Sequence, residues 1–180
     1  MFSDGVWFDP KDQLFKAWYF AGRLTEKPLQ HATALAISRD GIHWEKPDFG
    51  IVPGTNIVLP DTNGLRRNSS TAWLDLFEGD PALRFKMFRV VQQDNAGGKE
   101  HRNFIQYSTS PDGIHWTKPA LDLFDVMGTR RNNVILAGSA PLSHNFSPLL
   151  DARPGVPVTE RFRSEEHTSE LQSPYVISYA

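Results

Sequence analysis

Short apolar runs alternate with turn signals along most of the chain. The runs GVWFD, LFKAWYFAG and TALAISRD follow one another closely from residue 5, and GIHWEKP completes the group at residue 47. These runs are rich in aromatic and β-branched residues, which is typical of strands rather than helices. We therefore expect a four-stranded antiparallel sheet over about residues 5–47, with GIHWEKP as its fourth strand.

The same series then begins again. TAWLDL, RFKMFRVVQQ, NFIQYSTS and GIHWTKP occupy about residues 71–119, and a third start, FSPLLD followed by ERF, occupies about residues 146–162. Four antiparallel strands that recur at such a period are the signature of β-propeller blades. The sequence thus predicts an all-β fold with about two and a fraction four-stranded blades.

The decapeptide SRDGIHWEKP of residues 38–47 returns as SPDGIHWTKP in residues 110–119. Asp-Gly is expected to form the hairpin turn between the third and fourth strands, because glycine accepts a positive φ and aspartate accepts local backbone N–H bonds. The Ile and Trp of each copy are expected to be buried between neighbouring sheets. His43 and His115 occupy the same place in the two copies, so we interpret both as structural.

Three aspartates follow the first strand of each unit: Asp9, Asp75 and Asp151. Asp9-Pro10 is itself a turn dipeptide. An aspartate in this position can accept a backbone N–H bond from the turn. We expect all three to cap turns.

Composition excludes several classes of partner. Nineteen Lys and Arg face 21 Asp and Glu, so the chain lacks the basic excess that nucleic acids or anionic membranes attract. No apolar window long enough for membrane insertion and no signal peptide are visible in this fragment, and no cysteine is present. We expect no metal and no cofactor.

Residues 163–180 depart from the style of the rest of the chain. RSEEHTSELQS, residues 163–173, matches an in-frame translation of a common sequencing adapter at every position, and ISYA, residues 177–180, matches its continuation. We expect this segment to be derived from the adapter and leave it out of the fold prediction.

Long connections, residues 48–70 and 120–145, separate the predicted blades and share the related motifs GTNIVLP and RRNNVILAG. Connections of this kind cross one face of a propeller and end near its centre, where ligands bind. Together with DGIHW, WLDLFEGDPALRFKMF and HNFSPLLDARPGVPVTERF, these motifs resemble the five-bladed β-propeller glycoside hydrolases of the fructosidase-like and arabinanase-like group. The resemblance covers most of residues 1–162 and implies a secreted or periplasmic protein with a carbohydrate ligand in a central funnel.

The resemblance also implies a set of three carboxylates, because glycoside cleavage needs one carboxyl as acid and another as nucleophile or base. Asp4 in FSDGVWF matches the first of them. Where the family has an Arg-Asp pair before the second blade, this chain has Arg67-Asn68, and where the family has a Glu it has Ser143-His144-Asn145.

Within the implied site, His144 is a candidate acid or base, since histidine titrates near neutral pH. The resemblance further implies Arg66, Arg67, Asn68 and Asn145 as sugar-binding residues. The alternative reading of Asp4 is an Asp-Gly turn residue.

Three interpretations stay open. The first is a glycoside hydrolase-like enzyme, and the second is a sugar-binding or scaffolding propeller without a full acidic set. The third is a sialidase-like propeller, which the S-x-D-G-x-x-W pattern suggests, although that family's turn has one more residue between Asp and Trp.

Overall fold

The computed structural model describes residues 3–23, 30–61, 65–94, 101–137, 146–151, 153–157, 162–165 and 175–176. Strands dominate the described ranges, as the sequence predicts. They are β1 (Ser3–Asp9), β2 (Leu14–Arg23), β3 (Gln30–Ser38), β4 (Ile57–Pro60), β5 (Leu65–Leu74), β6 (Phe85–Asp94), β7 (His101–Ser110), β8 (Val134–Ala137), β9 (Ser147–Leu150), β10 (Phe162–Glu165) and β11 (Tyr175–Val176). A short 3₁₀ turn, η1 (Pro81–Leu83), lies between β5 and β6.

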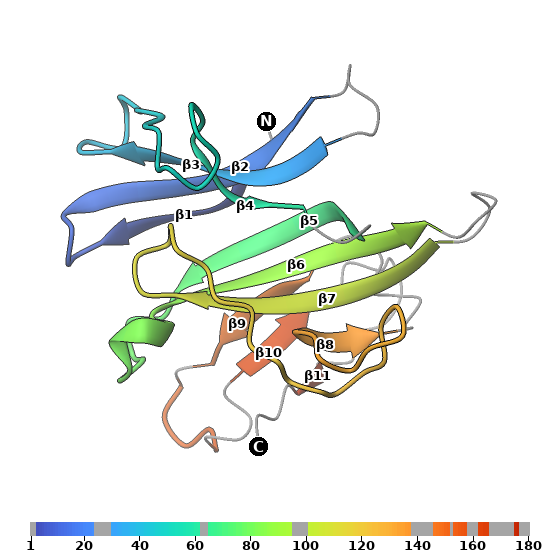
Figure 1. The fold of residues 1–180 in the computed structure, drawn as a ribbon. Helices are drawn as coiled ribbons and strands as arrows, with labels where there is room; N and C mark the ends of the chain where they lie inside the picture. The colour runs from blue at the N-terminus through green and yellow to red at the C-terminus, as the bar shows by residue number, and fades with distance from the viewer. Residues whose placement is uncertain are drawn as a thin grey trace.

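The strands form three antiparallel sheets. The N-terminal sheet has the order β1-β2-β3-β4, the central sheet has the order β5-β6-β7-β8, and the C-terminal sheet has the order β11-β10-β9. Figure 1 shows the central sheet lying between the other two. The prediction of an all-β chain with two repeated four-stranded antiparallel sheets is therefore confirmed.

The fourth strand of each repeated sheet is a different segment from the one predicted. After the DGIHW turn the chain makes a single bridge to the third strand, Ile37 to Glu45 in the first copy and Thr109 to Thr117 in the second. Pro47 and Pro119 follow closely, and proline has no N–H with which to continue a ladder. The fourth strands are instead β4 and β8, which lie inside the segments predicted to be connections.

An asparagine starts each of these fourth strands in the same way. The Asn56 side-chain N–H donates to the Leu35 carbonyl at 2.9 Å, and the Asn133 side-chain N–H donates to the Tyr107 carbonyl at 2.6 Å. Both asparagines therefore hold the returning chain against the third strand.

The core follows the two-residue period of the strands. On β2, Trp18 faces the central sheet and is fully buried, and it packs with Phe85 and Met87 of β6 in one apolar cluster. On the opposite face of β6, Phe88 and Val90 pack with Phe146, which precedes β9. Each repeated sheet thus presents one face to the next sheet along the chain.

The two DGIHW copies differ in burial, which corrects the prediction that both fill an interface. Ile114 and Trp116 pack against the cluster around Trp18, as expected. Ile42 and Trp44 are exposed. The difference arises because the second copy has the N-terminal sheet beside it, whereas no described segment covers the first copy.

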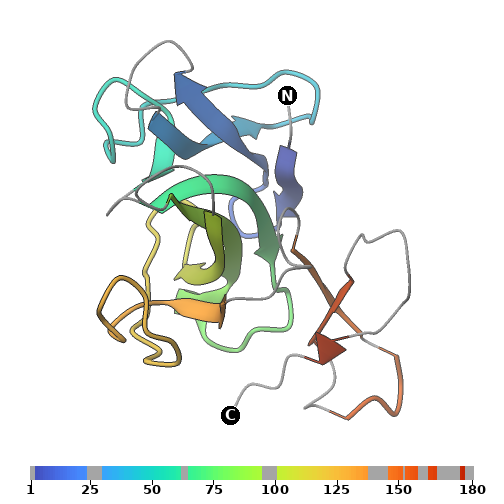
Figure 2. The same ribbon diagram turned by 90° about the vertical axis from the view of Figure 1, so that its right-hand side faces the viewer.

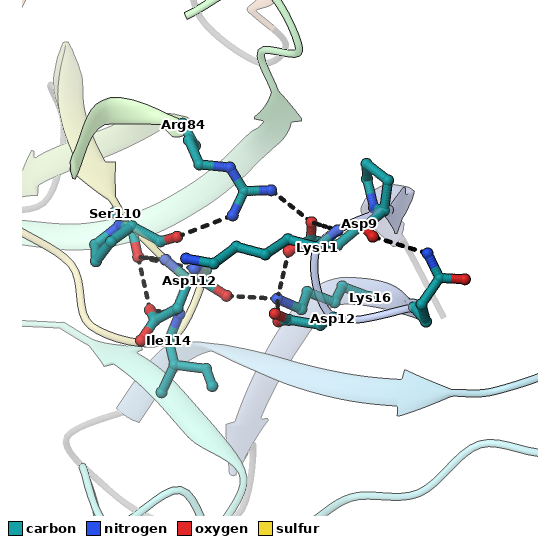
Figure 3. A network of polar contacts seen from close by, with 12 residues as sticks. Asp9, Lys11, Asp12, Lys16, Arg84, Ser110, Asp112 and Ile114 are labelled. Atoms are coloured by element: carbon teal, nitrogen blue, oxygen red, sulfur yellow. Dashed lines mark hydrogen bonds and ion pairs between the residues drawn. The ribbon is translucent and has the colours of Figure 1, made fainter. Parts of the chain in front are cut away.

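A buried ion-pair network joins the N-terminal sheet to the second DGIHW copy (Figure 3). The Lys16 ammonium donates to Asp9 at 3.0 Å, to Asp12 at 2.6 Å and to the Asp112 carbonyl at 2.8 Å. Arg84 reaches Asp9 from the central sheet at 2.5 Å. Within the central sheet Lys86 repeats the pattern with Asp75 and Glu78, at 2.8 and 2.9 Å.

The three predicted turn caps are confirmed. Asp9 accepts the Lys11 backbone N–H at 3.0 Å and Asp75 accepts the Phe77 backbone N–H at 3.0 Å. Asp151 accepts that of Arg153 at 3.3 Å. In all three units the aspartate carboxylate accepts the backbone N–H of the second residue after it, so the three turns are built in the same way.

The C-terminal sheet includes some of residues 163–180, the segment that we expect to be derived from a sequencing adapter and did not include in the fold prediction. Residues 163–165 belong to β10, which pairs with β9, and β11 pairs with β10. This pairing uses backbone groups, which any sequence can offer to an unpaired edge such as that of β9. The ladders that β10 forms with β9 and β11 are shorter than the β2–β3 and β6–β7 ladders of the two repeated sheets.

Candidate functional site

The candidate site lies where the first strands of the two repeated sheets meet. β1 and β5 pack against each other, and Figure 2 shows them near the middle of the molecule. Each of these strands carries an irregularity in its ladder. The register shifts between Ser3 and Gly5 in β1, and between Arg67 and Ser69 in β5, so Asp4 and Asn68 are the extra residues. A bulge of this kind redirects a side chain out of the regular alternation.

Asp4 and Arg67 contact each other across the two sheets. Both are buried, and the Arg67 Nη2–H donates to Asp4 Oδ2. The Arg67 Nε–H donates to the Ser70 hydroxyl at 2.7 Å, and the guanidinium lies 4.9 Å from the centre of the Phe20 ring. The structure thus brings together two of the residues that the sequence singles out, from positions 63 apart in the chain.

A second carboxylate and a second guanidinium extend this pair. Asp61, just after β4, accepts the Arg67 backbone N–H at 2.9 Å and an Arg89 Nη2–H at 2.5 Å. Arg89 lies on β6 and is buried. The four side chains of Asp4, Arg67, Asp61 and Arg89 are here called the aspartate–arginine cluster.

Sequence reasoning missed Asp61 and Arg89. Asp61 directly follows the repeated motif NIVLP, which could have drawn attention to it. Arg89 lies in the apolar run RFKMFRVVQQ and carries no signal of its own, because its role depends on the cross-sheet contact with Asp61.

His31 closes one side of the cluster. Its Nδ1 lies 3.0 Å from the Arg67 carbonyl, and its ring packs edge-on against Phe20 with centroids 4.9 Å apart. The Arg67 guanidinium also stacks on Phe20. Arg67 is therefore held at its backbone, at its Nε and on the face of its guanidinium.

Burial governs the protonation of the cluster. Burial raises the pKa of Asp4 to about 6, against the opposing pull of Arg67 and Arg89. Burial likewise lowers the pKa of Arg67 and of Arg89, although Asp4 and Asp61 favour their charged forms. For Asp4 the cost of removing charge from water therefore exceeds the attraction of the ion pair.

Two buried N–H groups of the cluster have no hydrogen-bond partner among the described residues: Arg67 Nη1 and Arg89 Nε. An unpaired buried donor costs about 1–3 kcal/mol. An acceptor placed beside Arg67 Nη1 would therefore stabilise the site.

The other predicted site residues have different surroundings. The Arg66 side chain reaches Gln92 of the neighbouring strand at 3.4 Å, and Asn68 is partly buried at its bulge. His144 and Asn145 lie outside the described residues.

The two histidines interpreted as structural, His43 and His115, are exposed, and each contacts the aspartate of its own turn. His43 Nδ1 and His115 Nδ1 each lie 2.7 Å from the aspartate of their own turn, Asp40 and Asp112. Neither contacts a residue of the aspartate–arginine cluster in any described hydrogen bond.

Within the described ranges, no group of three or more His, Cys, Asp or Glu side chains has the arrangement of a metal site. None of the described helices has the length and apolar character needed to cross a bilayer.

The chain was compared with known proteins in three ways. No protein-family model, no curated protein and no solved structure matches it.

Proposed function

We propose that this chain is part of a β-propeller that acts on carbohydrates as a glycoside hydrolase, with the two repeated sheets as its first two blades. In this proposal β1 and β5 are the innermost strands and border the central funnel. Asp4 is the nucleophile or base, and Arg67 orients it and binds substrate hydroxyl groups together with Arg66 and Asn68. His144 and Asn145 are further candidates, with His144 as an acid or base.

The observation that carries the proposal is the contact of Asp4 with Arg67 between the two first strands. A carboxyl whose pKa is about 6 is ionised at neutral pH, yet it can still exchange a proton in that range. Glycoside cleavage requires carboxyl groups that are tuned in this way. The unpaired Arg67 Nη1–H is a donor suited to a sugar hydroxyl.

A second candidate function, carbohydrate binding without cleavage, is favoured by one specific observation. The bulge of β5 carries Asn68, and an amide cannot supply the negative charge that stabilises an oxocarbenium-like transition state. Under this alternative Asp4 and Arg67 form a structural ion pair beside a sugar-binding surface.

The test is made on the completed protein of which this chain is proposed to be a part, and it compares wild type with Asp4→Asn and with a control, Asp122→Asn. Asp122 is exposed and has a positive φ of 56°, which asparagine tolerates. Hydrolysis is measured on a panel of glycosides, and binding is measured separately on a panel of glycans. If Asp4 is the nucleophile or base, Asp4→Asn lowers turnover by at least about a hundredfold and leaves binding nearly unchanged, while the control retains activity.

His144→Gln extends the test: a shifted pH profile of turnover would support an acid or base role for His144. Wild type that binds glycans but cleaves none of the panel would establish the binding function instead. Wild type that does neither would refute both.

A further inference from the structure

The aspartate–arginine cluster lies beside one more cation, Lys118, which follows the second DGIHW turn. Partial removal of the Lys118 ammonium from water lowers its pKa, the charge of Arg89 lowers it further, and Asp61 opposes the shift. The ammonium is therefore near both Arg89 and Asp61. Lys118 is nevertheless exposed overall, so it lies at the surface edge of the cluster.

With Lys118 included, the positive charges of this site outnumber its carboxylates. Asp4 pairs with Arg67, and Asp61 pairs with Arg89 at 2.5 Å. Lys118 adds a third cation to these two ion pairs. Burial lowers the pKa of Arg89, Asp61 opposes the shift, and the charge of Arg67 adds to it, so the two guanidinium groups repel each other. The site as a whole has a net positive charge when all of these side chains are ionised.

Both arginines also keep a buried hydrogen-bond donor unused. Arg67 is 1 % exposed and Arg89 2 %, and neither Arg67 Nη1 nor Arg89 Nε has a partner among the described residues. Asp61 joins the two arginines, because one of its oxygens accepts the Arg67 backbone N–H and the other accepts from Arg89. The Asp61 side chain is 17 % exposed, so the cluster reaches the surface there as well as at Lys118. A negatively charged acceptor that entered here would satisfy the donors and reduce the repulsion between the cations.

We propose that this site binds the carboxylate of an acidic sugar, so that the carbohydrate recognised by the protein is a uronate-containing glycan. That the anion belongs to a sugar rests on the proposed function, whereas the preference for an anion rests on the residues themselves. The two oxygens of a carboxylate can accept from Arg67 Nη1 and Arg89 Nε, and Lys118 adds its charge at the surface edge. Hydrogen bonds between ionised partners are about twice as strong as neutral ones. A neutral hydroxyl would satisfy one donor but would not balance the excess positive charge.

The internal repeat supplies a matched control for Lys118. Lys46 occupies the same place after the first DGIHW turn, in GIHWEKP, as Lys118 does in GIHWTKP. The Lys46 ammonium lies over the Tyr19 ring, 5.3 Å from its centre. Tyr19 is next to Trp18 on β2 and so points to the opposite face of the sheet, away from the central sheet. Lys46→Gln therefore removes the same charge from the same kind of turn, outside the proposed site.

The experiment measures sugar binding to the full 180-residue chain by NMR titration, with wild type, Lys118→Gln and Lys46→Gln. The probes are matched pairs that differ in one carboxylate: the methyl glycosides of glucuronic acid and glucose, and those of galacturonic acid and galactose. Sodium acetate is titrated separately as a free carboxylate. Circular dichroism spectra and thermal melting confirm that both variants fold, which is expected because both lysines are exposed.

We expect wild type to bind at least one uronate at least about tenfold more tightly than its neutral partner. Lys118→Gln should reduce this preference at least about threefold, and Lys46→Gln should leave it unchanged. Equal affinity for the two members of each pair, or no binding of either uronate, would overturn the proposal. An equal loss in both variants would show a general effect of charge, and acetate that binds as tightly as the uronates would show a site for free anions; either result would also overturn it.

These outcomes are separate from those of the hydrolysis test. Neutral sugars that bind as tightly as uronates would contradict the present inference and leave the proposed function standing. A preference for uronates that depends on Lys118, together with no cleavage by the completed protein, would refute hydrolysis and support the present inference.

Discussion

Asp4 shows how burial can raise the pKa of a carboxyl even where that carboxyl is paired with an arginine. Its partner Arg67 favours the carboxylate, but burial opposes charge on both side chains, and burial has the larger effect on the pKa of Asp4. Arg67 is in turn fixed by Asp61, Ser70 and the Phe20 ring. A single carboxyl can therefore be both structurally paired and chemically tunable.

The raised pKa predicts a dependence of stability on pH. The pKa of Asp4 is about 6 in the folded chain and 3.8 for an ordinary aspartate, so between these pH values the folded chain binds the Asp4 proton more tightly than the unfolded chain does. Protonation of Asp4 therefore contributes fully to the free energy of unfolding below about pH 4. This contribution falls as the pH rises through 6 and does not change further above that.

Urea unfolding between pH 3 and pH 8 tests this expectation. The difference between wild type and Asp4→Asn should change across the window from about pH 4 to 6 and be flat from pH 7 to 8. A difference that does not vary with pH would show that Asp4 titrates at its ordinary value.

The DGIHW turn illustrates what an element contributes by itself and what its neighbour adds. Both copies build the same turn from the same local hydrogen bonds, with φ of 75° at Gly41 and 79° at Gly113. Only the second copy lies against another sheet. A Cβ atom on Gly113 would come within 2.5 Å of the Trp18 ring, whereas one on Gly41 would meet nothing closer than 3.7 Å.

This contrast predicts unequal effects of one substitution. Gly41→Ala should cost about 1 kcal/mol of stability, because alanine is strained at a positive φ. Gly113→Ala should cost a further 1–3 kcal/mol or so, since it also forces Trp18 out of its packing position. Chemical denaturation of the two single variants measures the difference, and equal losses would argue against the tight contact between the turn and Trp18.

The whole molecule is unevenly stabilised. The N-terminal and central sheets share one apolar cluster and the buried contacts of Lys16 and Arg84, whereas the C-terminal sheet has short ladders. Local stability generally follows such differences in burial and pairing. The two repeated sheets should therefore act as the cooperative unit.

Deletion of residues 163–180 tests this expectation. The truncated chain should melt within about 2 °C of the full chain, because none of the described hydrogen bonds between the N-terminal and central sheets involves that segment. Thermal unfolding followed at 280 nm reports on the tryptophans of the two sheets. A much lower melting temperature would show that β10 and β11 support the rest of the fold.

Local patterns were enough to predict the all-β class, the two repeated sheets and the turn caps at Asp9, Asp75 and Asp151. These features depend on alternation along a strand and on bonds between residues two apart, which the order of residues specifies directly. The fourth strands were predicted at the wrong place because the residues of DGIHWEKP are typical of a strand. The segment makes only a single bridge to the third strand, and its proline cannot extend the ladder. The segments IVLP and VILA become strands only where a third strand offers its edge.

Local sequence patterns do not predict the aspartate–arginine cluster. Asp4 and Arg67 could each be singled out in the sequence, but their contact, and the presence of Asp61 and Arg89 beside them, depend on how one sheet packs on another. The same packing partly buries Trp116 and leaves Trp44 exposed, although the two turns have nearly the same sequence. Long-range contacts of this kind are set by the packing of faces, and one local sequence is compatible with either environment.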